Sequence, residues 1–174
     1  SDWTSVVAGY EFSCGLRGQK AYCWGDNNYG QVGNGETGND IMLPSQVGTA
    51  TDWIQIAAGY RHACGLRADG SAWCWGFNSY YQLGDNTTTV RSTPVQVFGA
   101  ETFTDIAAGT YTTCGVLSDG GLRCWGNNNN GQVGDGTLST RKIPTVVGVD
   151  MDWAQVHGGW YHMCGTKNDG RLHC

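Results

Sequence analysis

The amino-acid sequence predicts an all-β fold made of β-propeller blades, each with about four antiparallel strands. A segment of about fifty residues recurs in phase along the 174-residue chain. Each copy contains short β-type segments separated by turns rich in Gly and Asn, and no segment shows helical periodicity. Four strands in a repeat of this length are typical of a propeller blade.

The repeat defines the expected domain organisation. Three full copies cover 1–50, 51–100 and 101–150, and a partial fourth copy covers 151–174. Blades of this kind bury their flanks only against neighbouring blades. We therefore expect residues 1–174 to form a single partial or half propeller that self-associates or belongs to a longer repeat array.

The first strand of each copy ends in small residues, which suits strands crowded near a central axis. It is expected over Trp3–Ala8, Trp53–Ala58, Phe103–Ala108 and Trp153–His157. A cysteine-containing hairpin supplies the second and third strands, and the third ends in Trp-Gly. The fourth strand is expected to begin at Pro44, Pro94 and Pro144, and a leading proline predicts an edge strand.

The eight cysteines predict one disulfide in each hairpin. With Ala68-Asp69-Gly70 as a three-residue loop and Gly70 left-handed, Cys64 lies opposite Cys74. The first hairpin is one residue shorter, and a two-residue Gly18-Gln19 turn restores the same opposition. Directly opposed residues lie within disulfide reach. The expected pairs are Cys14–Cys23, Cys64–Cys74, Cys114–Cys124 and Cys164–Cys174.

Four disulfides imply an oxidising compartment, so a secreted, periplasmic or cell-surface location is expected. The net charge is −5 and no basic run is present, which argues against a nucleic-acid partner. No segment reaches the apolar length that spans a membrane, and no signal peptide is visible, so a secreted form would be mature or trimmed.

The repeat motifs resemble those of the regulator of chromosome condensation family. The resemblance rests on Ala-Ala-Gly-Tyr-Arg-His-Ala-Cys-Gly-Leu at 57–66, on Cys74-Trp75-Gly76 and on Gly-Gln-Val-Gly-Asp-Gly at 131–136. It implies a propeller, typically seven-bladed, that binds rather than catalyses. The nuclear nucleotide-exchange member lacks paired cysteines, so this chain is more similar to the secreted bacterial branch.

The candidate binding face comprises residues that vary while the repeat frame stays constant. They follow the first strand of each copy and are expected on one propeller face: Tyr10, Tyr60, Arg61, Tyr111, Trp160 and Tyr161. Aromatic and Arg side chains are the usual energetic anchors of protein interfaces. The alternative is that these Tyr residues only cap loops.

Other chemical candidates have mainly structural interpretations. His62 and His162 share one repeat position and are expected to pack, and Trp24, Trp75 and Trp125 are expected as core wedges. Asn86-Thr87-Thr88 matches the glycosylation acceptor pattern. No nucleophile–base pair or carboxylate-rich metal loop is recognisable, so no enzyme activity, cofactor or metal is expected.

The function expected is an extracellular, non-catalytic module that binds a protein or a glycan. A structural protein that self-assembles into rings or filaments is the alternative. A secreted enzyme inhibitor is a more distant alternative, because the family resemblance includes an inhibitor of a β-lactamase.

Overall fold

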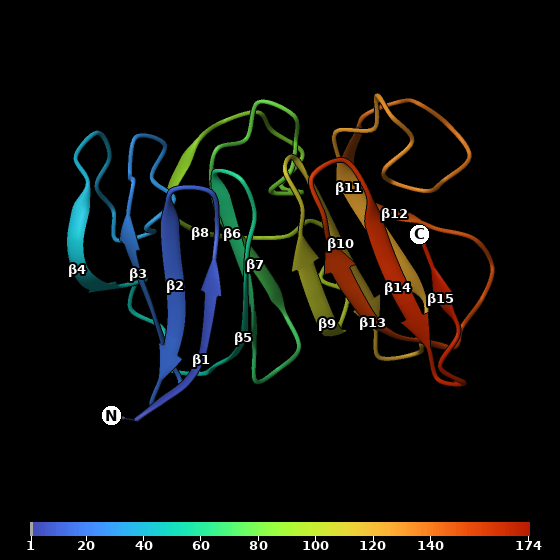
Figure 1. Cartoon of the computed structure of the whole chain (residues 1–174), viewed down its shortest axis with the longest axis horizontal. Helices are drawn as coiled ribbons and strands as arrows, with labels where there is room; N and C mark the ends of the chain where they lie inside the picture. The colour runs from blue at the N-terminus through green and yellow to red at the C-terminus, as the bar shows by residue number, and fades with distance from the viewer. Residues whose placement is uncertain (1) are drawn as a thin grey trace.

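The computed structural model describes residues 2–174, which contain no helix and form four antiparallel sheets, each a propeller blade (Figure 1). Blade 1 consists of β1 (Trp3–Ala8), β2 (Phe12–Arg17), β3 (Lys20–Gly25) and β4 (Ile41–Gln46). Blade 2 consists of β5 (Trp53–Ala58), β6 (His62–Arg67), β7 (Ala72–Gly76) and β8 (Arg91–Gln96). The fold class expected from the repeat is confirmed.

The remaining strands repeat this order. Blade 3 consists of β9 (Phe103–Ala108), β10 (Thr112–Leu117), β11 (Leu122–Gly126) and β12 (Arg141–Val146). Blade 4 consists of β13 (Trp153–Gly158), β14 (Met163–Lys167) and β15 (Leu172–His173). Each sheet pairs its strands in chain order, so every connection within a blade joins neighbouring strands.

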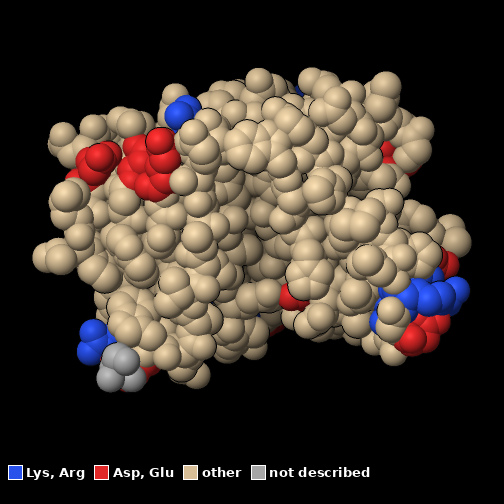
Figure 2. Space-filling model, in the orientation of Figure 1, with Lys and Arg blue, Asp and Glu red and all other residues tan. Residues whose placement is uncertain are grey.

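The four blades follow one another in an arc, with blade 1 and blade 4 at its two ends (Figure 1). The first strands of successive blades contact one another along the inner side of this arc. They line a cleft of about 360 Å³, whose walls include Val7, Ile56, Ile106 and Val156. Figure 2 shows the hollow between the two halves of the molecule.

The hairpin register follows the expectation. Cys64 pairs with Cys74 and Leu66 with Ala72 across β6 and β7. Gly70 adopts φ +78°, and the shorter first hairpin turns through Gly18 and Gln19 at φ +55° and +59°. Disulfides join Cys14–Cys23, Cys64–Cys74, Cys114–Cys124 and Cys164–Cys174, with Cα–Cα distances of 4.0–4.1 Å.

The outermost strand begins earlier than expected. β4, β8 and β12 start three residues before Pro44, Pro94 and Pro144, so each proline lies inside its strand rather than leading it. These strands pair on one side only, and a proline nitrogen on an unpaired edge removes no ladder hydrogen bond. The edge-strand expectation is therefore confirmed, but the expected start of each strand is wrong.

The hydrophobic core lies between blades rather than within them. One buried cluster joins Cys14, Leu16 and Val32 of blade 1 to Trp53 and Ile56 of blade 2. Equivalent clusters join blades 2 and 3 and blades 3 and 4. Each blade therefore has two apolar faces, one directed to the preceding blade and one to the following blade.

The small residues at the end of each inner strand permit close approach between blades. A Cβ atom on Gly59 would collide with the carbonyl oxygen of Gly109 in the next blade. Any larger residue here would push the inner strands apart, as expected for glycine at a close backbone contact. This packing brings the loops after the inner strands together around the axis.

Candidate binding face

The loops between the first and second strands place four equivalent side chains around the axis. Tyr10, Tyr60, Thr110 and Trp160 surround a funnel of about 300 Å³ whose wall is formed by Ala and Gly residues of the inner strands. The three aromatic rings among them contact one another. The ring centroids of Tyr10 and Tyr60 are 4.5 Å apart, and that of Trp160 lies 5.7 Å from Tyr60 and 6.2 Å from Tyr10.

The residues at the next repeat position widen this surface. The ring of Tyr111 lies 5.6 Å from Tyr60, and that of Tyr161 lies 6.1 Å from Trp160. The structure therefore brings the aromatic side chains expected at the binding face into one continuous cluster. We call Tyr10, Tyr60, Arg61, Tyr111, Trp160 and Tyr161 the aromatic face.

Arg61 is held by aromatic rings on two sides. Its guanidinium carbon lies 5.0 Å from the ring centroids of both Tyr29 and Tyr60. Its Nη1 donates a hydrogen bond of 3.3 Å to the hydroxyl of Tyr29. Stacking between two rings restricts the rotamers of a long side chain, so Arg61 is a pre-ordered cation within an aromatic surround.

Three further aromatic residues join the face from loops that sequence reasoning treated only as turns. Tyr80 lies 4.8 Å and Phe77 5.8 Å from the ring of Tyr111, and Tyr29 lies 5.0 Å from Phe77. The signal available in the sequence was an aromatic residue within an otherwise Asn- and Gly-rich connection. Burial and the nearby hydroxyls of Tyr60 and Tyr80 raise the pKa of Tyr111, which favours the neutral phenol.

The tryptophans of the three hairpins do not share one environment. Trp75 and Trp125 are fully buried between blades, and the indole nitrogens donate hydrogen bonds of 2.9 and 3.0 Å to the carbonyls of Gln31 and Gln82. Trp24 is only partly buried and its ring lies 5.8 Å from that of Trp3. The expectation of a core wedge is therefore wrong for Trp24, because within residues 2–174 no blade packs on that side of blade 1.

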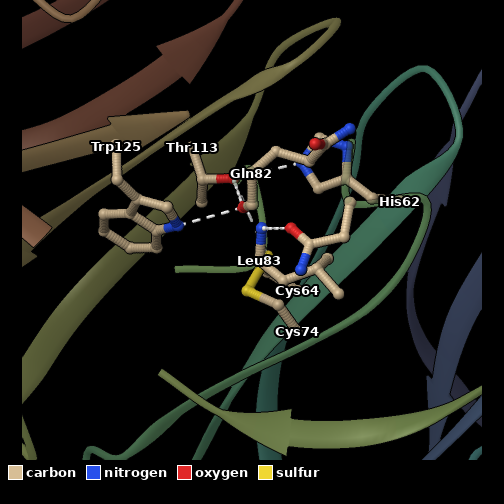
Figure 3. Close-up of a disulfide and its surroundings, with 8 residues drawn as sticks. His62, Cys64, Cys74, Gln82, Leu83, Thr113 and Trp125 are labelled. Carbon is tan, nitrogen blue, oxygen red and sulfur yellow. Dashed lines mark hydrogen bonds between the residues drawn. A yellow bond between two sulfur atoms is a disulfide. The ribbon is translucent and has the colours of Figure 1, made fainter. Parts of the chain in front are cut away.

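The two histidines at equivalent repeat positions, His62 and His162, also differ in burial. His62 is fully buried, and its Nε2 lies 3.1 Å from the hydroxyl of Thr113, which itself donates to the carbonyl of Gln82 (Figure 3). Burial lowers the pKa of His62 to about 3, so the ring is neutral. His162 is exposed, so the expected structural packing holds for His62 alone.

Asn86 of the glycosylation pattern is exposed in the loop after β7, at φ +63°. Within residues 2–174, no group of three or more His, Cys, Asp or Glu side chains is placed to hold a metal ion. The same residues include no helix that could cross a membrane.

Two family models of the regulator of chromosome condensation (RCC1) repeat match the sequence. One matches residues 3–31, 53–82 and 103–132, and the other matches 20–66, 69–116 and 119–165. The second model alone covers most of the chain. No curated protein sequence gives a significant match.

Solved structures with the same fold include human WBSCR16, at a TM-score of 0.87 and 23% identity over 98% of this chain and 46% of that one. Prp20p from Saccharomyces cerevisiae gives a TM-score of 0.84 at 21% identity, over 94% of this chain and 43% of Prp20p. The ectodomain of the receptor kinase CR4 from Physcomitrella patens gives 0.62 at 24% identity, over 99% and 40%. The chain thus spans less than half the length of each of these proteins.

Proposed function

The chain belongs to the regulator of chromosome condensation (RCC1) repeat family, and from this premise we propose that it is an extracellular, non-catalytic module that binds a protein partner. The observation that carries the proposal is the convergence of all four blades on one aromatic face. Tyr10 and Trp160, from the first and last blades, contact one another across the axis. Residues far apart in the sequence thereby contribute to one surface.

The exposure of this face favours binding over loop capping. Tyr10, Trp160 and Tyr161 keep 50%, 54% and 56% of their surface accessible, although each contacts another ring. Large, exposed aromatic side chains supply most of the energy at protein interfaces. Because the rings already pack against one another, a partner would lose little side-chain entropy on docking.

The extracellular assignment is supported by the four disulfides, since structural disulfides persist in oxidising environments. Proteins with this fold include one that is extracellular and one that binds other proteins, the two properties that we propose for this chain. The Physcomitrella protein is a receptor ectodomain, and the Prp20p structure was described together with binding to Gsp1p and histones.

The test compares partner capture by two variants with that by the wild type. The double variant Tyr10→Ser/Trp160→Ser removes the ring contact at the centre of the face. Met42→Ser/Leu43→Ser is the matched control, because these side chains are 84% and 77% exposed on β4, away from the face. Immobilised proteins are incubated with the extracellular fraction of the source, and bound proteins are quantified by mass spectrometry.

We expect a protein that the wild type and the control capture alike and that the face variant captures at least about tenfold less, as for loss of a central anchor. An unchanged far-ultraviolet circular dichroism spectrum would show that the variant is folded. Equal capture by the face variant, or capture of a glycan instead of a protein, would contradict the proposal.

A second candidate function, self-assembly, is favoured by the open flank of blade 1. There Val6 is 61% exposed, and Trp3 and Trp24 are only partly buried. In this reading residues 1–174 form one half-propeller domain whose open flanks are covered by further copies. Light scattering tests it: Val6→Ser/Trp24→Ser should shift oligomers toward monomer, and a wild-type monomer at micromolar concentration would exclude it.

A further inference from the structure

Arg61 differs from the other arginines of the chain in having no carboxylate partner. The sequence contains seven arginines, and six of them pair with an Asp or Glu at N–O distances of at most 3.8 Å. Glu11 occupies the repeat position of Arg61 in blade 1, but it is exposed and makes no ion pair with Arg61. Among residues 2–174, Arg61 is therefore the one arginine whose charge is not neutralised.

The guanidinium of Arg61 is also partly withdrawn from water. Its Nε is buried without a hydrogen-bond partner, and its one hydrogen bond within the described residues runs from Nη1 to the Tyr29 hydroxyl. Aromatic rings attract a cation through their faces, but they do not replace a carboxylate as the acceptor of its N–H groups. Because a desolvated charge without paired acceptors is costly, the site favours an incoming anion.

Arg61 completes a closed ring of five side chains, which we call the Arg61 cluster. Its members in order are Arg61, Tyr60, Tyr111, Phe77 and Tyr29, and successive aromatic centroids lie 5.0–5.8 Å apart. The guanidinium joins the two ends, 5.0 Å from Tyr29 and from Tyr60. Blade 2 supplies three members and is packed on both flanks, against blades 1 and 3. The position of the cation is thus set by two interfaces within the chain.

The cluster offers two kinds of hydrogen-bond donor to a single acceptor group. The guanidinium presents its N–H groups in a fixed fork that matches a carboxylate. The Tyr29 hydroxyl already accepts from Nη1, so its own proton is available to a further acceptor, and none is present among residues 2–174. The surrounding rings displace water, which strengthens an ion pair formed beside them. A carboxylate carried next to an apolar group fits this arrangement.

We propose that the protein partner of the aromatic face places an Asp or Glu side chain at Arg61, with an adjacent apolar residue packed on the rings of the cluster. The inference rests on the proposed function, that this face binds a protein, and adds the chemistry of the segment that docks. The net charge of the chain is −5, so the preference for an acid is local to Arg61 and does not come from the overall charge.

Titration with two dipeptides tests this preference on the wild-type chain. Acetyl-Phe-Glu-amide carries the carboxylate, and acetyl-Phe-Gln-amide is its neutral isostere. In proton–nitrogen correlation spectra at low salt, the Glu dipeptide should bind at least about threefold more tightly and should shift the Arg61 Nε–H resonance. Equal affinities, or no saturable binding of the Glu dipeptide, would overturn the proposal. Tighter binding of inorganic phosphate than of the Glu dipeptide would also contradict it.

Two substitutions remove the same charge at different places. Arg61→Gln should abolish the difference in affinity between the two dipeptides. Lys20→Gln is the matched control and should preserve it, because Lys20 begins β3 at the turn of the first hairpin, at the end away from Tyr10. A preference for the Glu dipeptide that survives Arg61→Gln would show that another group binds the carboxylate and would refute the assignment.

The capture experiment separates failure of this inference from failure of the proposed function. Arg61→Gln should capture at least about threefold less of the protein that the wild type captures, and Lys20→Gln should capture the same amount. Equal capture by Arg61→Gln would overturn the acid contact and leave protein binding by the face intact. Capture of no protein by the wild type would contradict the proposed function, whereas the dipeptide titration would still decide the acid preference of Arg61.

Discussion

Blades 1 and 2 carry the same repeat but bury it differently. Val6 on β1 is 61% exposed, whereas Ile56 at the same position on β5 is 4% exposed. Trp24 is partly accessible and Trp75 is fully buried. By contrast, both hairpin disulfides have fully buried cysteines.

The difference shows that each blade has one face for each neighbour. The face with Ile56 and Trp75 packs on the preceding blade, and among the described residues no blade packs on the equivalent face of blade 1. The face with the disulfide packs on the following blade, which both blade 1 and blade 2 have. Burial in this architecture is therefore a property of an interface between repeats, as in other stacked repeat proteins.

The largest expected effect separates the two tryptophans. Trp75→Ala should lower the free energy of unfolding by about 3–5 kcal/mol, because it leaves a cavity between blades 1 and 2 and deprives the Gln31 carbonyl of its donor. Trp24→Ala should cost about 1 kcal/mol or less, since its ring is already partly hydrated. Urea denaturation measures both, and equal losses would break the comparison.

The inner strands should show the same contrast with smaller side chains. Ile56→Ala should cost about 2–4 kcal/mol, because it creates a cavity between blades 1 and 2. Val6→Ala on the open flank should change the free energy of unfolding by less than about 0.5 kcal/mol. A large loss for Val6→Ala would show that another molecule covers that flank in solution.

Removing the disulfides should affect the two blades alike. Cys14→Ala/Cys23→Ala and Cys64→Ala/Cys74→Ala open loops of nearly equal length, with sequence separations of 9 and 10. Each should cost about 2–3 kcal/mol in the chain-entropy treatment of such loops. Unfolding free energies that differ by more than about 1 kcal/mol between the two variants would contradict a purely local stabilisation.

The smallest expected effect concerns the two histidines. Because burial lowers the folded-state pKa of His62 to about 3, protonation near its ordinary value of 6.5 favours the unfolded chain. The His62 contribution is thus fully present above about pH 6.5 and is lost as the pH falls from there toward 3. At pH 5.5 the loss relative to pH 7.5 should be about 1 kcal/mol.

His62→Thr should remove this part of the pH dependence, since Thr112 occupies the same repeat position in blade 3. His162→Thr is the matched control and should preserve it, because His162 is exposed. The measurement is the difference in unfolding free energy between the two pH values. A slope unchanged in His62→Thr would show that His62 does not remain neutral in the fold.

The sequence alone determined the features that depend on short separations along the chain. The hairpin register and the four disulfide pairs follow from counting residues across a turn, since strand alternation permits only one opposition. The strand order within each blade and the left-handed Gly70 follow from the same local rules.

Only the tertiary structure decided what depends on a neighbouring blade. It distinguished buried Trp75 from accessible Trp24 and buried His62 from exposed His162, and it brought Tyr29, Phe77 and Tyr80 onto the aromatic face. It also showed that the outer strands, already predicted as edge strands, begin three residues before Pro44, Pro94 and Pro144. Identical repeat residues carry no information about which interfaces exist, because burial depends on the blade that packs against them.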